Sequence, residues 1–87
     1  MPDKAFIIYK VTPKDMDNIA ETERAVKGIK SGVVKDVKRE PIGFGIELIK
    51  VGVLVNEKEA GAMEKVTKEL QDIEGVEEVE QEAMTLL

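Results

Sequence analysis

Carboxylates are the most abundant side chains that could take part in chemistry in this 87-residue chain. Eighteen Asp and Glu residues include close pairs such as Glu77 with Glu78 and Glu57 with Glu59. A general acid and base need surroundings that separate two pKa values, which requires partial burial in a cleft. These pairs fall on predicted edge strands and at predicted helix starts, where water reaches both carboxylates. We therefore expect no catalytic residue, but a solvated acidic surface.

Other groups that commonly carry chemistry are absent from the composition. The sequence has no Cys and no His, so it lacks thiolates, disulfides, imidazole bases and the most common metal ligands. The remaining oxygen ligands do not follow the spacing of a calcium loop. The Gly-Phe-Gly run at 43–45 lacks the third glycine of a dinucleotide fingerprint and the Gly-Lys-Ser/Thr end of a P-loop. We expect neither a metal nor a cofactor.

The net charge of −5 and the pI near 4.8 restrict the partners as well. Nucleic acid and anionic membrane surfaces bind clustered Lys and Arg, so this acidic balance argues against both. No apolar run approaches the length of a membrane span, and the N-terminal one is too short for a signal peptide. We expect a single domain over residues 1–87, cytoplasmic and monomeric, although the sequence leaves the oligomeric state open.

Four segments have the residue patterns of β-strands. Residues 5–11 and 46–55 are rich in branched apolar residues on both faces, which is typical of central strands. Residues 33–40 alternate charged residues with valine, and residues 76–84 are weakly apolar and strongly acidic. Both patterns are typical of edge strands, where charge discourages pairing with another chain.

Two segments between these strands have helical periodicity. The first helix begins after Asn18, which is placed to cap it, with Glu21 completing a capping box. The second helix is predicted from about Glu59 to Ile73, and Gly75 stops it. The inward-facing positions are Ile19, Thr22, Val26 and Ile29 in the first helix, and Met63, Val66, Leu70 and Ile73 in the second.

The two halves of the chain repeat each other. A shift of 44 positions superimposes the first helix stripe on the second, and residues 6–11 on residues 50–55. The chain therefore consists of two consecutive strand–helix–strand units. This order predicts an α+β fold of the ferredoxin-like split βαβ type, with a four-stranded antiparallel sheet and both helices on one face.

The two halves are connected by residues 40–46, EPIGFGI. This segment combines one residue with a restricted backbone and two glycines with unusual backbone freedom. Pro41 extends the preceding residue and removes a backbone donor, while Gly43 and Gly45 permit backbone angles barred to other residues. Phe44 either folds back over the end of the sheet or stands exposed as an anchor for another protein. Burial of an exposed ring in a partner would contribute roughly 1.5–3 kcal/mol, and such anchors often dominate an interface.

The EPIGFGI run, the GVEEVE segment (75–80) and the C-terminal AMTLL (83–87) together resemble the archaeal elongation factor 1-beta family. The resemblance implies guanine-nucleotide exchange on elongation factor 1-alpha, the GTPase that delivers aminoacyl-tRNA to the ribosome. It also implies that Phe44 inserts into this GTPase. The expected partner-binding residues are Pro41, Ile42, Gly43, Phe44, Gly45, Met84 and Leu86.

The chain departs from its eukaryotic relatives at two positions. Leu86 stands where they carry a lysine that approaches the magnesium site of the GTPase, and no Lys or Arg follows Lys68. Glu47 also replaces a lysine. Displacement of magnesium by a C-terminal cation is therefore not implied here.

Two further expectations concern partners. The acidic segment from Glu77 to Glu82 could face a basic patch on the GTPase and speed encounter. The alternative function is that of a small regulatory module of the same fold, which would bind a metabolite at strand–helix junctions.

Overall fold

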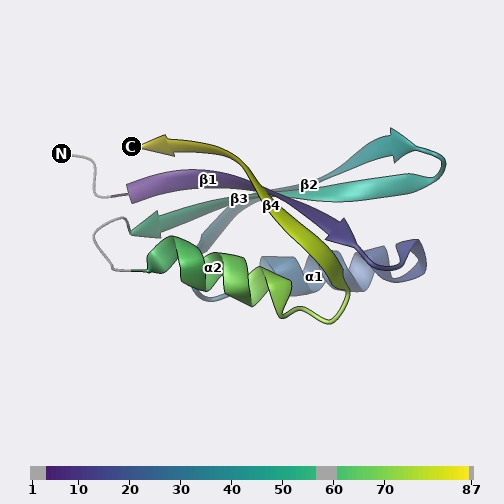
Figure 1. Ribbon diagram of the computed structural model, residues 1–87, viewed down its shortest axis with the longest axis horizontal. Helices are drawn as coiled ribbons and strands as arrows, with labels where there is room; N and C mark the ends of the chain where they lie inside the picture. The colour runs from purple at the N-terminus through teal and green to yellow at the C-terminus, as the bar shows by residue number, and fades with distance from the viewer. Residues whose placement is uncertain (1–3, 57–60, 87) are drawn as a thin grey trace.

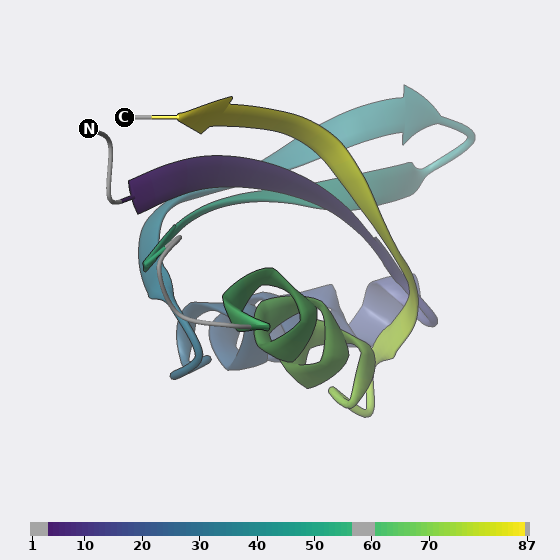
Figure 2. The same cartoon turned by 60° about the vertical axis from the view of Figure 1, so that its left-hand side comes forward.

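The computed structural model describes residues 4–56 and 61–86, with Leu86 described by its backbone alone. Four strands and two α-helices follow one another in the predicted order (Figure 1). Their bounds are β1 Lys4–Pro13, α1 Ile19–Lys27, β2 Val33–Gly43, β3 Ile46–Asn56, α2 Ala62–Gln71 and β4 Val76–Leu86, and a short 3₁₀ helix, η1, covers Met16–Asn18. Both α-helices lie against the same face of the curved sheet (Figure 2). The predicted α+β ferredoxin-like arrangement is confirmed.

The order of the strands in the sheet is β2-β3-β1-β4, and every neighbouring pair is antiparallel. The two apolar strands are central and the two charged strands are the edges, as predicted. The central pair runs in register from Lys4 opposite Asn56 to Val11 opposite Ile49.

The core lies between the sheet and the helices. Every second side chain of the central strands faces the helices and is buried: Ala5, Ile7, Tyr9 and Val11 on β1, and Ile49, Val51, Val53 and Val55 on β3. Tyr9 is the large aromatic residue of this core, and its hydroxyl donates to the Met63 carbonyl and accepts a hydrogen bond from Thr67. Burial raises the pKa of this hydroxyl.

The opposite face of the sheet carries no helix (Figure 2). Phe6 lies on this open face and covers Gly52 of the neighbouring strand, where an added Cβ would overlap the ring. Gly52 therefore provides the space that the end of the Phe6 ring occupies against β3.

The start of α1 differs from the predicted capping box. Asn18 occupies the N-cap position, but its side chain makes no capping hydrogen bond. Asp15 instead accepts the Asp17 N–H at the start of η1, and Thr22 donates to the Asn18 carbonyl. The capping box with Glu21 was wrong because a 3₁₀ turn precedes the helix and shifts the cap upstream.

The end of α2 also differs from the prediction. The helix ends at Gln71 rather than Ile73, and its predicted start at Glu59 lies outside the described residues. Gly75 lies beyond the helix, in the turn before β4, where its carbonyl accepts the Lys14 N–H at 2.8 Å. A side chain at Gly75 would overlap Thr22 of α1, so this glycine permits close approach between the two halves.

Candidate partner-binding site

The connection between the halves is a tight β-hairpin rather than a loop. β2 and β3 stay paired until Gly43 faces Ile46, which leaves Phe44 and Gly45 as a two-residue turn. Pro41, Ile42 and Gly43 therefore belong to β2. An edge strand tolerates the proline because the backbone N–H groups on its outer side have no neighbouring strand to which they must donate.

The hairpin extends past the rest of the sheet. The pairing of β1 with β3 ends at Ile49, so residues 40–48 form a two-stranded ribbon that projects from one end of the molecule (Figure 1).

Phe44 adopts a backbone conformation that suits other residues better. Its φ is 56° and that of Gly45 is 74°, and positive φ at both central residues is the requirement of a type I′ turn. Asn or Gly is favoured at the first of these positions. Among the described residues Phe44 is the only non-glycine with positive φ. A left-handed conformation costs a residue with a Cβ roughly 1–2 kcal/mol.

The ring of Phe44 is fully exposed, at 102% of its reference area. The alternative in which it folds back and closes the core is therefore excluded. Neither the local conformation nor packing within the described chain accounts for a phenylalanine at this position.

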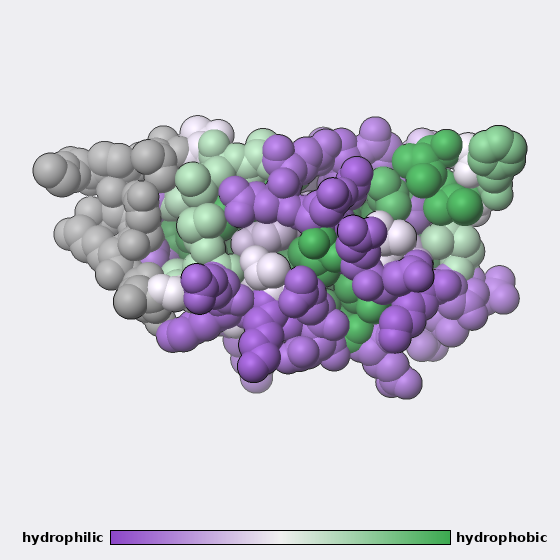
Figure 3. Space-filling view, in the orientation of Figure 1, coloured by the Kyte–Doolittle hydropathy of each residue, from purple (hydrophilic) through white to green (hydrophobic). Residues whose placement is uncertain are grey.

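Two further apolar side chains flank the ring. Ile42 is 54% and Ile46 is 40% exposed, and the space-filling view shows hydrophobic surface at the end of the molecule where the hairpin lies (Figure 3). The structure thus brings together five of the predicted site residues, Pro41 to Gly45, and adds Ile46. Sequence reasoning missed Ile46 because it was counted as the first residue of an apolar strand and not as part of the contact surface.

Met84 and Leu86 lie at the opposite end of the molecule. Met84 of β4 pairs with Ile7 of β1, and Ile7 pairs in turn with Val53 of β3. Val53 lies seven positions along β3 from Ile46. This corresponds to a separation of about 23 Å, at roughly 3.3 Å per residue. Met84 is 45% exposed. The structure therefore does not join these two residues to the hairpin, because the C-terminal end of β4 pairs with the beginning of β1.

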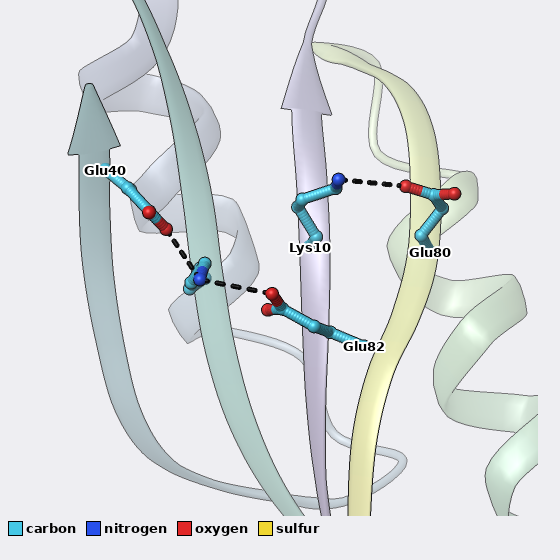
Figure 4. Close-up of polar contacts among 5 residues, drawn as sticks. Lys10, Glu40, Glu80 and Glu82 are labelled. Atoms are coloured by element: carbon cyan, nitrogen blue, oxygen red, sulfur yellow. Dashed lines mark hydrogen bonds and ion pairs between the residues drawn. The ribbon is translucent and has the colours of Figure 1, made fainter. Parts of the chain in front are cut away.

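Ion pairs cross the open face of the sheet below the hairpin (Figure 4). Lys50 Nζ lies 2.6 Å from Glu40 Oε2 and 3.2 Å from Glu82 Oε1, and Lys10 pairs with Glu80 at 3.2 Å. Hydrogen bonds from Lys50 to Glu40 and Glu82 raise the pKa of the amine. Sequence reasoning missed these pairs because they depend on the register between strands, and β1 and β4, which are not joined by a hairpin, have no turn that fixes it.

A hollow of about 460 Å³ lies between the start of α1 and the turn before β4, at a strand–helix junction where the metabolite-binding alternative would place its site. Its lining includes Lys14, Glu21 and Glu74, all exposed. No buried side-chain polar atom in the described part of the chain lacks a hydrogen-bond partner, so nothing in the hollow points to a ligand.

The residues described here also contain no cluster of three or more His, Cys, Asp or Glu suited to a metal ion. Within residues 4–56 and 61–86, no helix is both long and apolar enough to cross a bilayer. Fold and site together define a small α+β module whose distinctive feature is an exposed aromatic hairpin rather than a cleft with titratable groups.

Comparisons with known proteins agree on one family. Residues 6–87 match the EF-1 guanine nucleotide exchange domain. Elongation factor 1-beta of Methanospirillum hungatei is 40% identical over 87 residues, which cover the whole of both chains. Elongation factor 1-beta of Aeropyrum pernix is 38% identical over 79 residues, 87% of this chain and 88% of the relative. The chain belongs to the elongation factor 1-beta family of translation factors.

A solved structure supports the fold alone. The ACT domain from the GTP pyrophosphokinase of Chlorobium tepidum superimposes with a TM-score of 0.61, covering 94% of this chain and all of that one. Its sequence identity is only 16%, so the likeness carries no function. The family match does not favour the metabolite-binding alternative.

Proposed function

We propose that this chain promotes the exchange of GDP for GTP on elongation factor 1-alpha in the cytoplasm, and that Phe44 is its main anchor on the GTPase. The family match supports the exchange activity. One observation carries the role of Phe44: a fully exposed ring is held in a backbone conformation that disfavours phenylalanine. Strain of this kind persists where function requires the residue.

The hairpin would act through contact rather than covalent chemistry. A factor that prefers the nucleotide-free GTPase weakens nucleotide binding by the same factor, because the two affinities are linked. A thousandfold effect requires about 4 kcal/mol of differential contact. Burial of the Phe44 ring would supply roughly 1.5–3 kcal/mol, and Ile42 and Ile46 would add apolar area beside it.

The remaining predicted residues have two different roles in this proposal. Pro41, Gly43 and Gly45 shape the turn, since both glycines have positive φ. Met84 and Leu86 form a separate contact at the other end of the molecule. No step is assigned to a cation near Leu86, because the sequence has no Lys or Arg after Lys68.

Exchange by a Phe44→Ala variant tests the proposal. Release of a fluorescent GDP analogue from elongation factor 1-alpha should slow at least tenfold, because the main contact area is lost, while the unfolding midpoint should not fall. Val33→Ala is the matched control, since Val33 is 54% exposed at the far end of β2. Unchanged release with Phe44→Ala would refute the anchor role.

A further inference from the structure

The projecting part of the hairpin has no strand beside it. An isolated two-stranded ribbon is marginally stable and twists freely, so the direction of its tip depends on contacts near its base. β1 pairs with β3 only as far as Ile49, so no third strand supports the ribbon beyond that residue.

One such contact joins β2 to α1. Arg39 Nε donates to Glu23 Oε2 at 2.7 Å, and both side chains are partly covered. This hydrogen bond is the main reason that the pKa of Glu23 lies below its ordinary value. Arg39 faces Ile49, the last residue of β3 that β1 supports. The ion pair therefore holds the ribbon at the point where it leaves the sheet.

A second contact joins β3 to the 3₁₀ helix. The Glu47 N–H donates to Met16 Sδ at 3.2 Å, and Met16 packs against the core. Glu47 pairs with Pro41 across the ribbon, so this contact lies farther toward the tip than the first. Both contacts come from the segment η1–α1, which lies on the helix-covered side of the sheet (Figure 1).

We propose that Glu23 and Arg39 are positioning residues for nucleotide exchange: their ion pair, with Met16 beyond it, sets the angle at which the ribbon presents Phe44. On the open face Glu40 and Lys50 tie the same ribbon from the other side. This inference rests on the proposed anchor role of Phe44. A small error in the placement of a contact residue costs much of its effect.

The chain contains a matched control for this ion pair. Lys27 Nζ lies 3.6 Å from Glu23 Oε1 within the same helix. Arg39→Gln and Lys27→Gln therefore remove the same charge and one partner of the same carboxylate. Only Arg39→Gln removes a contact between the hairpin and α1. We expect Arg39→Gln to lower kcat/KM for exchange by about fivefold, whereas Lys27→Gln should lower it less than twofold.

Two readouts separate positioning from a general loss of structure. Exposed ion pairs contribute little to global stability, so neither variant should shift the unfolding midpoint appreciably. In the free protein, ¹⁵N order parameters at residues 42–46 should fall in Arg39→Gln and stay unchanged in Lys27→Gln. The exchanged pair Glu23→Arg with Arg39→Glu should restore at least half of the lost activity.

A double-mutant cycle with Phe44→Ala completes the test. If Arg39 acts mainly through Phe44, the effect of Arg39→Gln should be much smaller in the Phe44→Ala background, where only Ile42 and Ile46 remain to be positioned. Equal activities of Arg39→Gln and Lys27→Gln, or an undiminished effect without the ring, would overturn the positioning role. Failure of Phe44→Ala itself would instead overturn the anchor role, and the order parameters would still report whether the ion pair orders the hairpin.

Discussion

At the scale of single residues, Phe44 does not suit its own turn, and the proposed anchor role would account for its presence there. The turn would be more stable with Asn at this position, since Asn adopts positive φ readily. The sequence predicted a turn here from its two glycines. It could not predict an exposed ring, because exposure depends on the exact length of the hairpin, and β2 continues through Pro41 to Gly43.

Replacement of the ring by a residue that suits the turn should therefore separate stability from activity. We expect Phe44→Asn to raise the free energy of unfolding by about 0.5–1 kcal/mol, because it relieves left-handed strain without loss of packing. Exchange should fall at least tenfold in the same variant. Urea unfolding and fluorescent GDP release measure the two effects. A variant that is both less stable and fully active would contradict the assignment of strain and of function to this residue.

At the scale of elements, the hydrophobic pattern predicted the order of the strands well and the ends of the helices less well. The two most apolar strands are the central ones, so the order of the sheet followed from the hydrophobic pattern together with the strand–helix–strand repeat. Helix ends depend on backbone hydrogen bonds that composition does not reveal. The 3₁₀ turn at Met16 displaced the predicted cap at Asn18, and the close approach of Gly75 to Thr22 served packing rather than helix termination.

One helix residue joins the two halves. Glu69 of α2 accepts hydrogen bonds from the Lys30 N–H at 3.0 Å and the Ser31 N–H at 2.8 Å, and from the Ser31 hydroxyl. These residues form the connection between α1 and β2. These hydrogen bonds lower the pKa of Glu69 below its ordinary value of 4.5, and the hydrogen bond from the Ser31 side chain contributes most.

The stability of the protein should depend on this carboxylate and on pH. We expect Glu69→Gln to reduce the free energy of unfolding by about 1 kcal/mol at neutral pH, because charge-assisted hydrogen bonds are lost. A lowered folded-state pKa stabilises the protein above pH 4.5, and this contribution disappears as the pH falls through the folded-state value.

Urea unfolding of both proteins from pH 7 to pH 3 would measure this difference. The curves of wild type and Glu69→Gln should converge below pH 4.5. Glu64→Gln, an exposed change on the same helix, should leave the stability unchanged at every pH. A constant difference across the range would show that the ionised carboxylate is not responsible.

At the scale of the whole molecule, the elongated shape separates the two proposed contact points. The principal extents are 44 × 21 × 16 Å, and the hairpin and the C-terminal end of β4 occupy opposite ends (Figure 1). The predicted fold already implied this separation through its strand directions, but the predicted site grouped Met84 and Leu86 with the hairpin without applying them.

Effects at the two ends should be additive. Phe44 and Met84 lie more than about 20 Å apart along the sheet, and distant sites without shared partners act independently. The change in log kcat/KM for the double variant Phe44→Ala with Met84→Ala should equal the sum of the two single changes. A large deviation would indicate one continuous contact surface. No effect of Met84→Ala would remove the second contact point.

The acidic edge strand leads to a prediction about encounter. Glu80 and Glu82 pair with lysines of the sheet, whereas Glu77 and Glu78 make no ion pair within the described chain. If β4 faces a basic patch of the GTPase, association should slow steeply with added salt. Stopped-flow association rates at roughly 50 to 500 mM KCl, over which the Debye length shortens about threefold, measure this dependence. Glu77→Gln with Glu78→Gln should flatten it, and a flat response in the wild type contradicts steering.

The hairpin tip has no neighbours among the described residues of its own chain: a Cβ on Gly43 or Gly45 would meet nothing within 4 Å, and the ring between them is fully exposed. Mutations there leave the packing of the core undisturbed, and their cost to stability comes only from the geometry of the turn. Recognition and folding can therefore diverge separately in different lineages. A graft of residues 42–46 from one relative onto another would exchange the proposed recognition surface while the recipient keeps its own interior.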